Sequence, residues 1–415
     1  MDYENILTAL KNGNVPSDGA LEICMGRDDE IKEFEQILDK VKNGKAYTKF
    51  IKGSYGAGKS FFLKVIEEMA YKENFVVSWI TLSNEIPFNK FDVVYKNIAK
   101  NLTCKTGTSL EHIIERWITG IKMMAFEETM DPQRQNEIIE RNIREDLREV
   151  SEHSNPMAVA IENYHKFTNM GDYETAKYIQ SWLRGDSQIP FTIKRKFGVK
   201  GDVDKETALK YLEALSILIK SIGYDGLVVL IDEAEFIMKL HTSKLRDIAY
   251  NYIRDLYDDC SAGKFKNSLF LFASALEFFD DPKKGVVSYP PLNDRIEDTL
   301  KSDLKDMRKP ILELKGFNRD NLVEIAKKSM IIHEDAYKWN GGEKINPIID
   351  TIIDKHQENA ELTGGKITPR IFIRSFISIL DTVQQNQDFF SDSNSILTLF
   401  EDKEAEIEKE LEKDW

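Results

Sequence analysis

The sequence predicts an α/β fold with a parallel β-sheet core, a helical insertion within the core and a C-terminal helical lid domain. Short apolar runs that end in loops alternate with helical stretches, which is the pattern of βαβ units. About a hundred residues of helical pattern separate the second strand from the next one. After Lys309-Pro310 and one more strand-like run, the pattern is helical again.

Residues 1–103 are predicted to hold N-terminal helices and the first half of the core. A helix begins near Asp28, because acidic residues suit a first turn and apolar residues from Ile31 to Val41 then recur at helical spacing. A βαβ beginning follows, which indicates a parallel sheet. Its elements are a strand that leads into a loop at 53–60, a helix over 61–72, a strand over 75–82 and a helix over 88–101.

Residues 104–205 are predicted to form the helical insertion. Apolar residues between Leu110 and Ile121 lie on one face of a helix. Asp131-Pro132 and Asn155-Pro156 are typical of helix starts with proline in the first turn.

Residues 206–315 are predicted to complete the core with two strands, over 226–233 and 268–274, that are covered on both faces. A helical lid is expected over 316–385. An acidic, amphipathic tail follows over 386–415, and its Ile407, Leu411 and Trp415 share one helical face.

The composition predicts an ordinary cytoplasmic protein. The 415 residues carry a net charge of −14, which argues against a bulk electrostatic grip on nucleic acid; the densest basic stretch, Lys194-Arg195-Lys196, is expected to be a solvated loop. No apolar run approaches the length of a membrane span. The three cysteines are scattered, as in a reducing cytosol, and neither they nor the six histidines show metal-ligand spacing.

The loop after the first strand fits the phosphate-binding pattern G-x-x-x-x-G-K-[ST]. Glycines let backbone N–H groups converge on phosphate oxygens, and the helix that begins near Lys59 adds its positive end. Lys59 would reach the β- and γ-phosphates, and the Ser60 hydroxyl would bind Mg²⁺. The candidate nucleotide-binding residues are Gly53, Ser54, Tyr55, Gly56, Ala57, Gly58, Lys59, Ser60 and Phe61.

The strand after the insertion ends in Asp232-Glu233, which is the Walker B pattern. Asp232 would bind Mg²⁺, and Glu233 would polarise the water that attacks the γ-phosphate. The alternative is a core strand that happens to end in acids, and the phosphate loop favours the functional interpretation.

Three later residues are candidates for contact with the γ-phosphate. Ser274 ends the next strand, where it is either a phosphate sensor or an ordinary strand-end serine. Arg295 follows a proline-bearing loop and is either a surface residue or a finger for a neighbouring subunit's nucleotide. Arg370 lies in the first turn of a helix predicted to be capped by Thr368, where a cation opposes the helix dipole unless it meets an anion.

Together these motifs resemble an AAA+ P-loop ATPase of the branch that includes the archaeal and eukaryotic origin-recognition proteins. In that resemblance Ser274 is sensor 1, Arg295 the finger and Arg370 sensor 2. The resemblance also implies that Gly26 and Arg27 seat the adenine side of ATP. The chain departs from that branch because only about thirty residues follow the lid, which is too few for a winged-helix DNA reader.

Three stretches resemble a narrower family, the ATP-binding proteins of bacteriophage-exclusion (BREX) and related bacterial defence loci. They are FGVKGDVDKETALKYLEALSILIKSIGYDGLVVLIDEAE, SALEFFDDPKKGVVSYPPLNDRIED and SWLRGD. The resemblance implies ATP and Mg²⁺ as ligands, ATP hydrolysis, and assembly as a homo- or hetero-oligomer. It also implies defence-system partners such as a helicase or a nuclease, with DNA contacted directly or through a partner.

Two alternatives stay open. A nucleotide-gated scaffold would bind ATP with little turnover, although such a protein needs no water-activating Glu233. A DExx-box helicase would explain Asp232-Glu233-Ala234-Glu235, but it needs a second RecA-like domain where the sequence predicts a helical lid.

Overall fold

The structure, a computed structural model, describes residues 2–297, 306–362, 369–390 and 392–413. It divides into two compact units, each assembled from separate stretches of the chain. The helical unit comprises Met1–Lys32, Lys52–Glu68 and Glu313–Trp415, and the sheet unit comprises Glu33–Ile51 and Met69–Leu312. Two helices, α3 (Asp28–Lys42) and α4 (Lys59–Lys72), begin in the helical unit and end in the sheet unit.

The sheet unit is built on a six-stranded sheet with the order β3-β2-β4-β5-β1-β6. Strand β4 pairs in parallel with both β2 and β5, whereas β3 pairs antiparallel with β2. The predicted α/β fold with a mostly parallel sheet is therefore confirmed. The strands are β1 (Ala46–Lys52), β2 (Val76–Thr81), β3 (Leu102–Thr103), β4 (Leu227–Asp232), β5 (Ser268–Ser274) and β6 (Ile311–Glu313).

The two central strands are apolar because both faces of the sheet are covered. Every residue of β4 and β5 is buried, as the unbroken apolar runs predict. Phe50 on β1 stacks on Phe272 on β5 with ring centroids 5.3 Å apart. Strand β5 thus lies between β4, which ends in Asp232, and β1, which leads into the phosphate loop.

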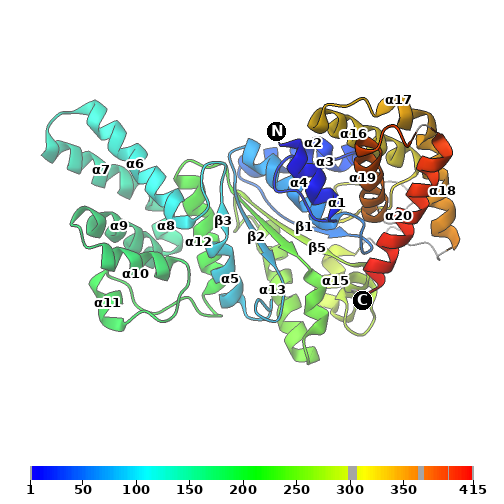
Figure 1. Ribbon diagram of the computed structural model, residues 1–415. Helices are drawn as coiled ribbons and strands as arrows, with labels where there is room; N and C mark the ends of the chain where they lie inside the picture. Colours follow the sequence, from blue (N-terminus) through cyan, green and yellow to red (C-terminus); the bar gives the residue numbers. More distant parts are fainter. Residues whose placement is uncertain (1, 298–305, 363–368, 391, 414–415) are drawn as a thin grey trace. The chain divides into compact units, whose positions relative to one another are not determined.

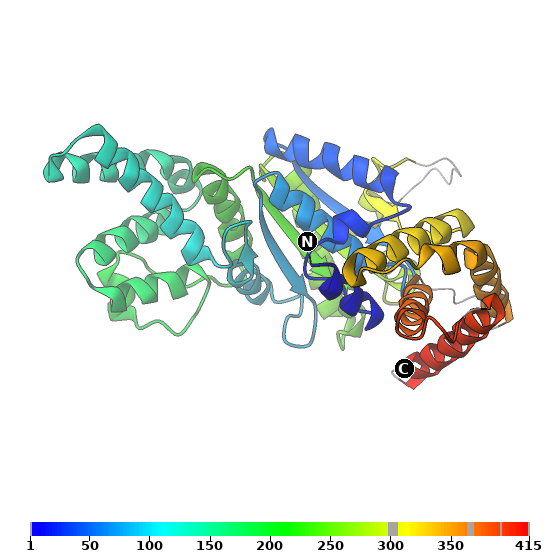
Figure 2. The ribbon, with the colours of Figure 1, turned by 45° about the horizontal axis from the view of Figure 1, so that its top comes forward.

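Helices α6–α11, within residues 110–196 of the sheet unit, gather beside α5 (Phe91–Lys100) and α12 (Ala208–Ser221), on the side of these two helices away from β5 (Figures 1 and 2). The Tyr95 hydroxyl of α5 donates to the carbonyl oxygen of Leu183 at 2.8 Å, which ties this bundle to the sheet's covering helices. Trp182 is fully buried in the bundle, as a core residue would be.

The sheet unit's remaining helices cover the sheet or connect its strands. Its helices are α5 (Phe91–Lys100), α6 (Leu110–Glu128), α7 (Pro132–Asp146), α8 (Arg148–His153), α9 (Asn155–Asn169), α10 (Tyr173–Leu183), α11 (Phe191–Lys196), α12 (Ala208–Ser221), η1 (Ala234–Lys239), α13 (Ser243–Ser261), α14 (Leu276–Asp280), η2 (Val286–Ser288) and α15 (Pro290–Ile296). The predicted division of the chain at 104, 206, 316 and 386 stays a prediction.

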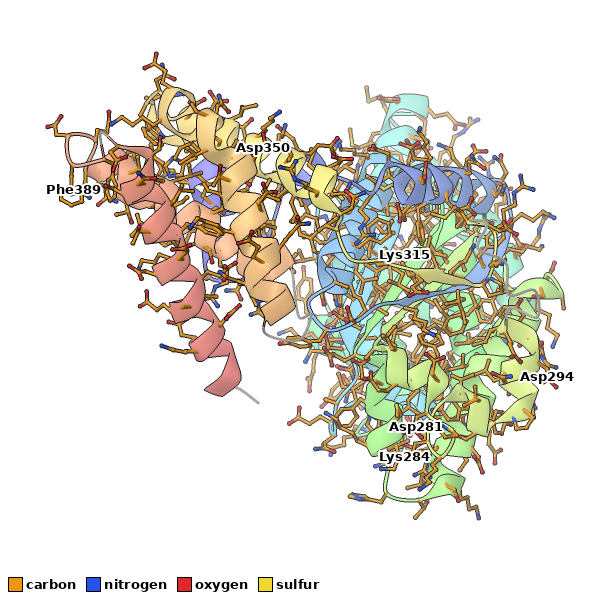
Figure 3. All side chains as sticks on the ribbon, turned by 90° about the vertical axis from the view of Figure 1, so that its right-hand side faces the viewer. Asp281, Lys284, Asp294, Lys315, Asp350 and Phe389 are labelled. Atoms are coloured by element: carbon orange, nitrogen blue, oxygen red, sulfur yellow. The ribbon has the colours of Figure 1, made fainter. Side chains whose placement is uncertain are left out.

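The helical unit packs its C-terminal helices side by side, with Asp350 on α18 and Phe389 in the connection between α19 and α20 (Figure 3). Ile407 is buried, whereas the side chains of Leu411 and Trp415 lie outside the described residues. The unit's own helices are α1 (Tyr3–Lys11), α2 (Ala20–Ile23), α16 (Arg319–Tyr337), α17 (Gly342–Ile345), η3 (Asn346–Ile348), α18 (Ile349–Leu362), α19 (Pro369–Gln385) and α20 (Ser393–Lys413).

Candidate functional site

The phosphate loop runs from the end of β1 to the first residue of α4. Gly56 and Gly58 have φ angles of 77° and 87°, in the left-handed region that glycine adopts without steric cost. The Lys59 ammonium donates to the carbonyl oxygens of Gly53 and Ser54, each at 3.1 Å. The loop therefore curls around its own lysine, which places a positive charge inside the turn.

The other loop residues differ in exposure. Ala57 is buried and anchors the loop, whereas Ser54 and Tyr55 are exposed. Ser60 and Phe61 are half-buried in the first turn of α4. A hydroxyl in that turn sits at the positive end of a helix, where anionic ligands and their metal ions bind.

Arg27 holds the backbone around the phosphate loop. Its guanidinium is buried and donates to the carbonyl oxygens of Ala57 at 3.4 Å and Lys315 at 2.7 Å; Lys315 is labelled in Figure 3. It also stacks over the Phe317 ring, 4.7 Å from the centroid. Burial lowers the pKa of Arg27, and the nearby Glu30 carboxylate opposes that shift. Its predicted contact with adenine stays a prediction.

Gly26, which precedes Arg27, lies against the start of α16. A Cβ at Gly26 would lie 2.5 Å from the Asn321 side-chain nitrogen, which belongs to the cap of α16. The residue also has a φ of 68°. Both facts require glycine where the chain turns into α3.

Arg370 reaches the phosphate loop within the helical unit. The guanidinium Nη1 donates to the Tyr55 hydroxyl oxygen at 3.3 Å. Tyr55 stands at a position where the phosphate-binding pattern allows any residue, and here it contacts helix α19. The Arg370 Nε is buried and has no hydrogen-bond partner among the described residues. Pro369 and Arg370 begin α19 as expected, while the predicted cap Thr368 lies outside the described residues.

The Walker B segment separates its two carboxylates. Asp232 is buried at the end of β4, and its Oδ1 accepts from the Glu233 backbone N–H at 3.0 Å. Glu233 is exposed and adopts a left-handed conformation with φ 57° and ψ 40°. This turn points the two consecutive acids into different environments.

Glu235 is a residue that the sequence interpretation did not place in the site. Its Oε2 accepts from the Ser274 hydroxyl at 2.8 Å and from the Ala275 backbone N–H at 3.3 Å. Ser274 is fully buried, so its hydroxyl proton is engaged by this carboxylate. The signal in the sequence was the third acid of Asp232-Glu233-Ala234-Glu235, three residues beyond the strand end.

Arg295 lies on α15 and is paired within its own chain. Its Nε donates to Asp258 Oδ1 on α13 at 2.6 Å, and its Nη1 donates to the Pro291 carbonyl oxygen. The Asp258 carboxylate raises the pKa of Arg295. The side chain remains about one-third exposed, at 35%. A contact with another subunit's nucleotide stays a prediction.

The basic stretch Lys194-Arg195-Lys196 was expected to be a solvated loop, and this expectation is wrong: it forms the end of helix α11. Lys194 is buried and pairs with Asp202 at 2.9 Å, and Lys196 pairs with Asp172. The Lys196 ammonium lowers the pKa of Asp172 to about 2. These pairs balance the charges of Lys194 and Lys196, while Arg195 is exposed.

The residues of the phosphate loop fit a nucleotide's phosphates by three observations. The left-handed glycines let the backbone close on an anion, and Lys59 supplies a cation inside the loop. The buried Arg370 Nε is a donor for which an anion would be a partner, and leaving such a donor unmet is costly.

None of the helices within 2–297, 306–362, 369–390 and 392–413 is long and apolar enough to cross a membrane.

Among solved structures, the chain is similar to domain III of the replication initiation protein DnaA from Thermotoga maritima. That similarity has 10% sequence identity and a TM-score of 0.39 and covers 94% of this chain and 98% of that one. No curated protein matches the chain. Residues 1–396 match the family described as BREX system ATP-binding protein BrxC/D, and the chain therefore belongs to this family of ATP-binding proteins of an anti-phage defence system.

Proposed function

We propose that this chain hydrolyses ATP and that the hydrolysis cycle switches or powers a multiprotein anti-phage defence assembly that acts on or with DNA. The geometry of Glu233 is the observation that supports hydrolysis best. A non-glycine residue in the left-handed region costs about 1–3 kcal/mol, and such strain is kept where a side chain must point in a required direction. Here it presents an exposed carboxylate beside the buried Asp232.

The proposed reaction is an in-line attack of water on the γ-phosphorus. Glu233 accepts a proton from the water, the new P–O bond forms, and the bond to the bridging oxygen of ADP breaks. Lys59 stabilises the β- and γ-phosphates, and Arg370 stabilises charge that develops on the γ-phosphate. Mg²⁺, bound by Ser60 and Asp232, would neutralise phosphate charge.

Ser274 and Arg295 have indirect roles in this proposal. Glu235 fixes the Ser274 hydroxyl at the end of β5, so Ser274 senses the γ-phosphate only if that contact rearranges. Arg295 acts in trans, which makes the active form a homo- or hetero-oligomer. The partners are proposed to be other defence-system proteins, such as a helicase or a nuclease, with DNA reached directly or through one of them.

The Glu233→Gln variant tests the hydrolysis proposal. We expect ATP hydrolysis to fall by roughly 10²–10⁴-fold, because the amide cannot accept the water's proton, while ATP affinity is retained. Steady-state phosphate release and an ATP-binding titration measure the two quantities. Hydrolysis by Glu233→Gln at the wild-type rate would instead support a nucleotide-gated scaffold.

The Lys59→Ala variant tests the phosphate loop itself. Loss of the ammonium that the loop encloses removes a phosphate contact, and we expect ATP binding to weaken by at least tenfold. The wild-type protein is assayed over a range of concentrations, with and without duplex DNA. Turnover that rises faster than linearly with protein concentration supports an oligomer, and stimulation by duplex DNA supports direct contact with DNA. A negligible rate in every condition would contradict autonomous hydrolysis.

A further inference from the structure

We infer that the N-terminal helix α1 and its terminal Gly13 are a positioning element that fixes the Arg370 guanidinium against the phosphate loop. The inference rests on the proposed function, in which Arg370 contacts the γ-phosphate. It adds a part of the chain, residues 3–14, that no nucleotide-binding motif covers.

Helix α1 is fastened to the helix that carries Arg370. Its Leu7 is buried against Ile332 on α16 and Ile377 on α19. The Lys11 carbonyl oxygen accepts from the Arg374 Nε at 3.0 Å, and the Lys11 ammonium pairs with Asp381. These contacts hold α1 to α19 at one and three turns beyond Arg370.

Gly13 ends α1 in a Schellman motif. Its N–H donates to the Leu10 carbonyl oxygen at 2.9 Å, the next N–H, of Asn14, donates to the Ala9 carbonyl oxygen at 2.8 Å, and its φ is 69°. A Cβ at this position would lie 2.6 Å from the Arg370 Nε and 3.0 Å from its Nη2. The missing side chain of Gly13 is therefore what admits the guanidinium.

The guanidinium is thus held between the Gly13 backbone and the Tyr55 side chain of the same unit. Gly13 lies against its Nε and Nη2, while Nη1 donates to the Tyr55 hydroxyl of the phosphate loop at 3.3 Å. The Nε has no other partner among the described residues, although it is buried. Contact with Gly13 therefore orients a buried donor for which a bound anion would be an acceptor.

The chain offers a closely matched control for a Gly13→Ala variant. Gly263 ends α13 with the same pair of hydrogen bonds, to Cys260 and Asp259 carbonyl oxygens, and has a φ of 73°. A Cβ at Gly263 would meet nothing within 4 Å. The two alanine variants carry the same backbone strain, but only one of them touches Arg370.

The experiment compares the two variants in the full chain by ATP hydrolysis, by the ratio of ATP to ADP affinity and by thermal unfolding. We expect Gly13→Ala to lower turnover on the order of tenfold and to reduce the preference for ATP over ADP. We expect Gly263→Ala to leave both unchanged. Asparagine adopts the left-handed conformation more readily than alanine and also carries a Cβ, so we expect the same effect from Gly13→Asn. This second variant tests the inference if Gly13→Ala does not fold.

A combined variant separates positioning from a general structural role. If Gly13 acts through Arg370, then Gly13→Ala has no further effect on turnover or on the ATP-to-ADP ratio in an Arg370→Ala chain. Equal losses in the Gly13 and Gly263 variants, or additive losses with Arg370→Ala, would overturn the inference alone. An Arg370→Ala chain with unchanged turnover and unchanged nucleotide preference would overturn the proposed role of Arg370 as well.

Discussion

The two arginines proposed to act on phosphate lie in opposite electrostatic situations. The Arg370 Nη1 donates to the Tyr55 hydroxyl oxygen, and its buried Nε has no hydrogen-bond partner among the described residues. Arg295 donates to the Asp258 carboxylate at 2.6 Å and to a backbone carbonyl oxygen. Within the described part of the chain, one guanidinium keeps a donor without an acceptor, and the other already has an anion.

This difference indicates two different conditions for activity. In the proposed function Arg370 gains a partner as soon as a nucleotide binds, so its contribution would need no second subunit. Arg295 must exchange Asp258 for a phosphate, and that exchange is favourable only if a partner surface positions the nucleotide. The comparison therefore predicts an effect of Arg370 at every protein concentration and an effect of Arg295 only where subunits associate.

Of the changes to the two arginines and their partners, Arg370→Ala is expected to have the largest effect. Loss of a positioned donor to developing charge costs roughly 10²-fold in turnover, and we expect this loss at every protein concentration. The ATP-to-ADP affinity ratio should fall as well, because ADP has no γ-phosphate to contact. Phosphate release measured across a dilution series checks both statements.

Arg370→Lys is the matched control for that prediction. Lysine keeps the charge but cannot reproduce the planar fork that contacts both Tyr55 and an anion, so we expect partial recovery of nucleotide preference and little recovery of turnover. Full activity of the lysine variant would show that only the charge matters. It would also contradict the geometric reading of the contact between Arg370 and Tyr55.

The contrast between the two arginines was only partly accessible from the sequence. Strands β4 and β5 were predictable because strands covered on both faces are unbroken apolar runs, and the phosphate loop has a fixed spacing. Pairing of Arg295 with Asp258 depends on how α13 and α15 pack, which no periodicity encodes. The same holds for Gly13 and Arg370, which meet although nearly the whole chain separates them.

Glu235 shows the same limit at shorter range. The sequence placed Ser274 at a strand end correctly, but the partner of its hydroxyl is set by the η1 turn that follows Glu233. The two-residue strand β3 was not predicted either, because it exists through its antiparallel pairing with β2. Its own pattern is too short to indicate a strand.

Arg295→Ala is expected to have a smaller, concentration-dependent effect. We expect turnover per chain to be unchanged in dilute protein and to fall by about tenfold at concentrations where the wild-type rate rises faster than linearly, since only there does a finger complete a neighbouring site. Sedimentation alongside the assay shows whether assembly persists in the variant. Equal loss at all concentrations would indicate that Arg295 acts within its own chain.

The smallest effect is expected for Asp258→Asn, which removes the anion that holds Arg295. The two side chains are 35% and 42% exposed, and an exposed ion pair contributes about 0.2–1 kcal/mol, which corresponds to a change of less than about fivefold. Because the variant releases the guanidinium, turnover should rise, and the concentration needed for half-maximal turnover should fall. Asp259→Asn on the same helix breaks the pair with Lys264 instead and should leave both quantities unchanged. A rise in turnover in both variants would indicate that reduced negative charge on α13 causes the effect. A rise in Asp258→Asn alone that disappears when Arg295→Ala is added would indicate that the released arginine causes it.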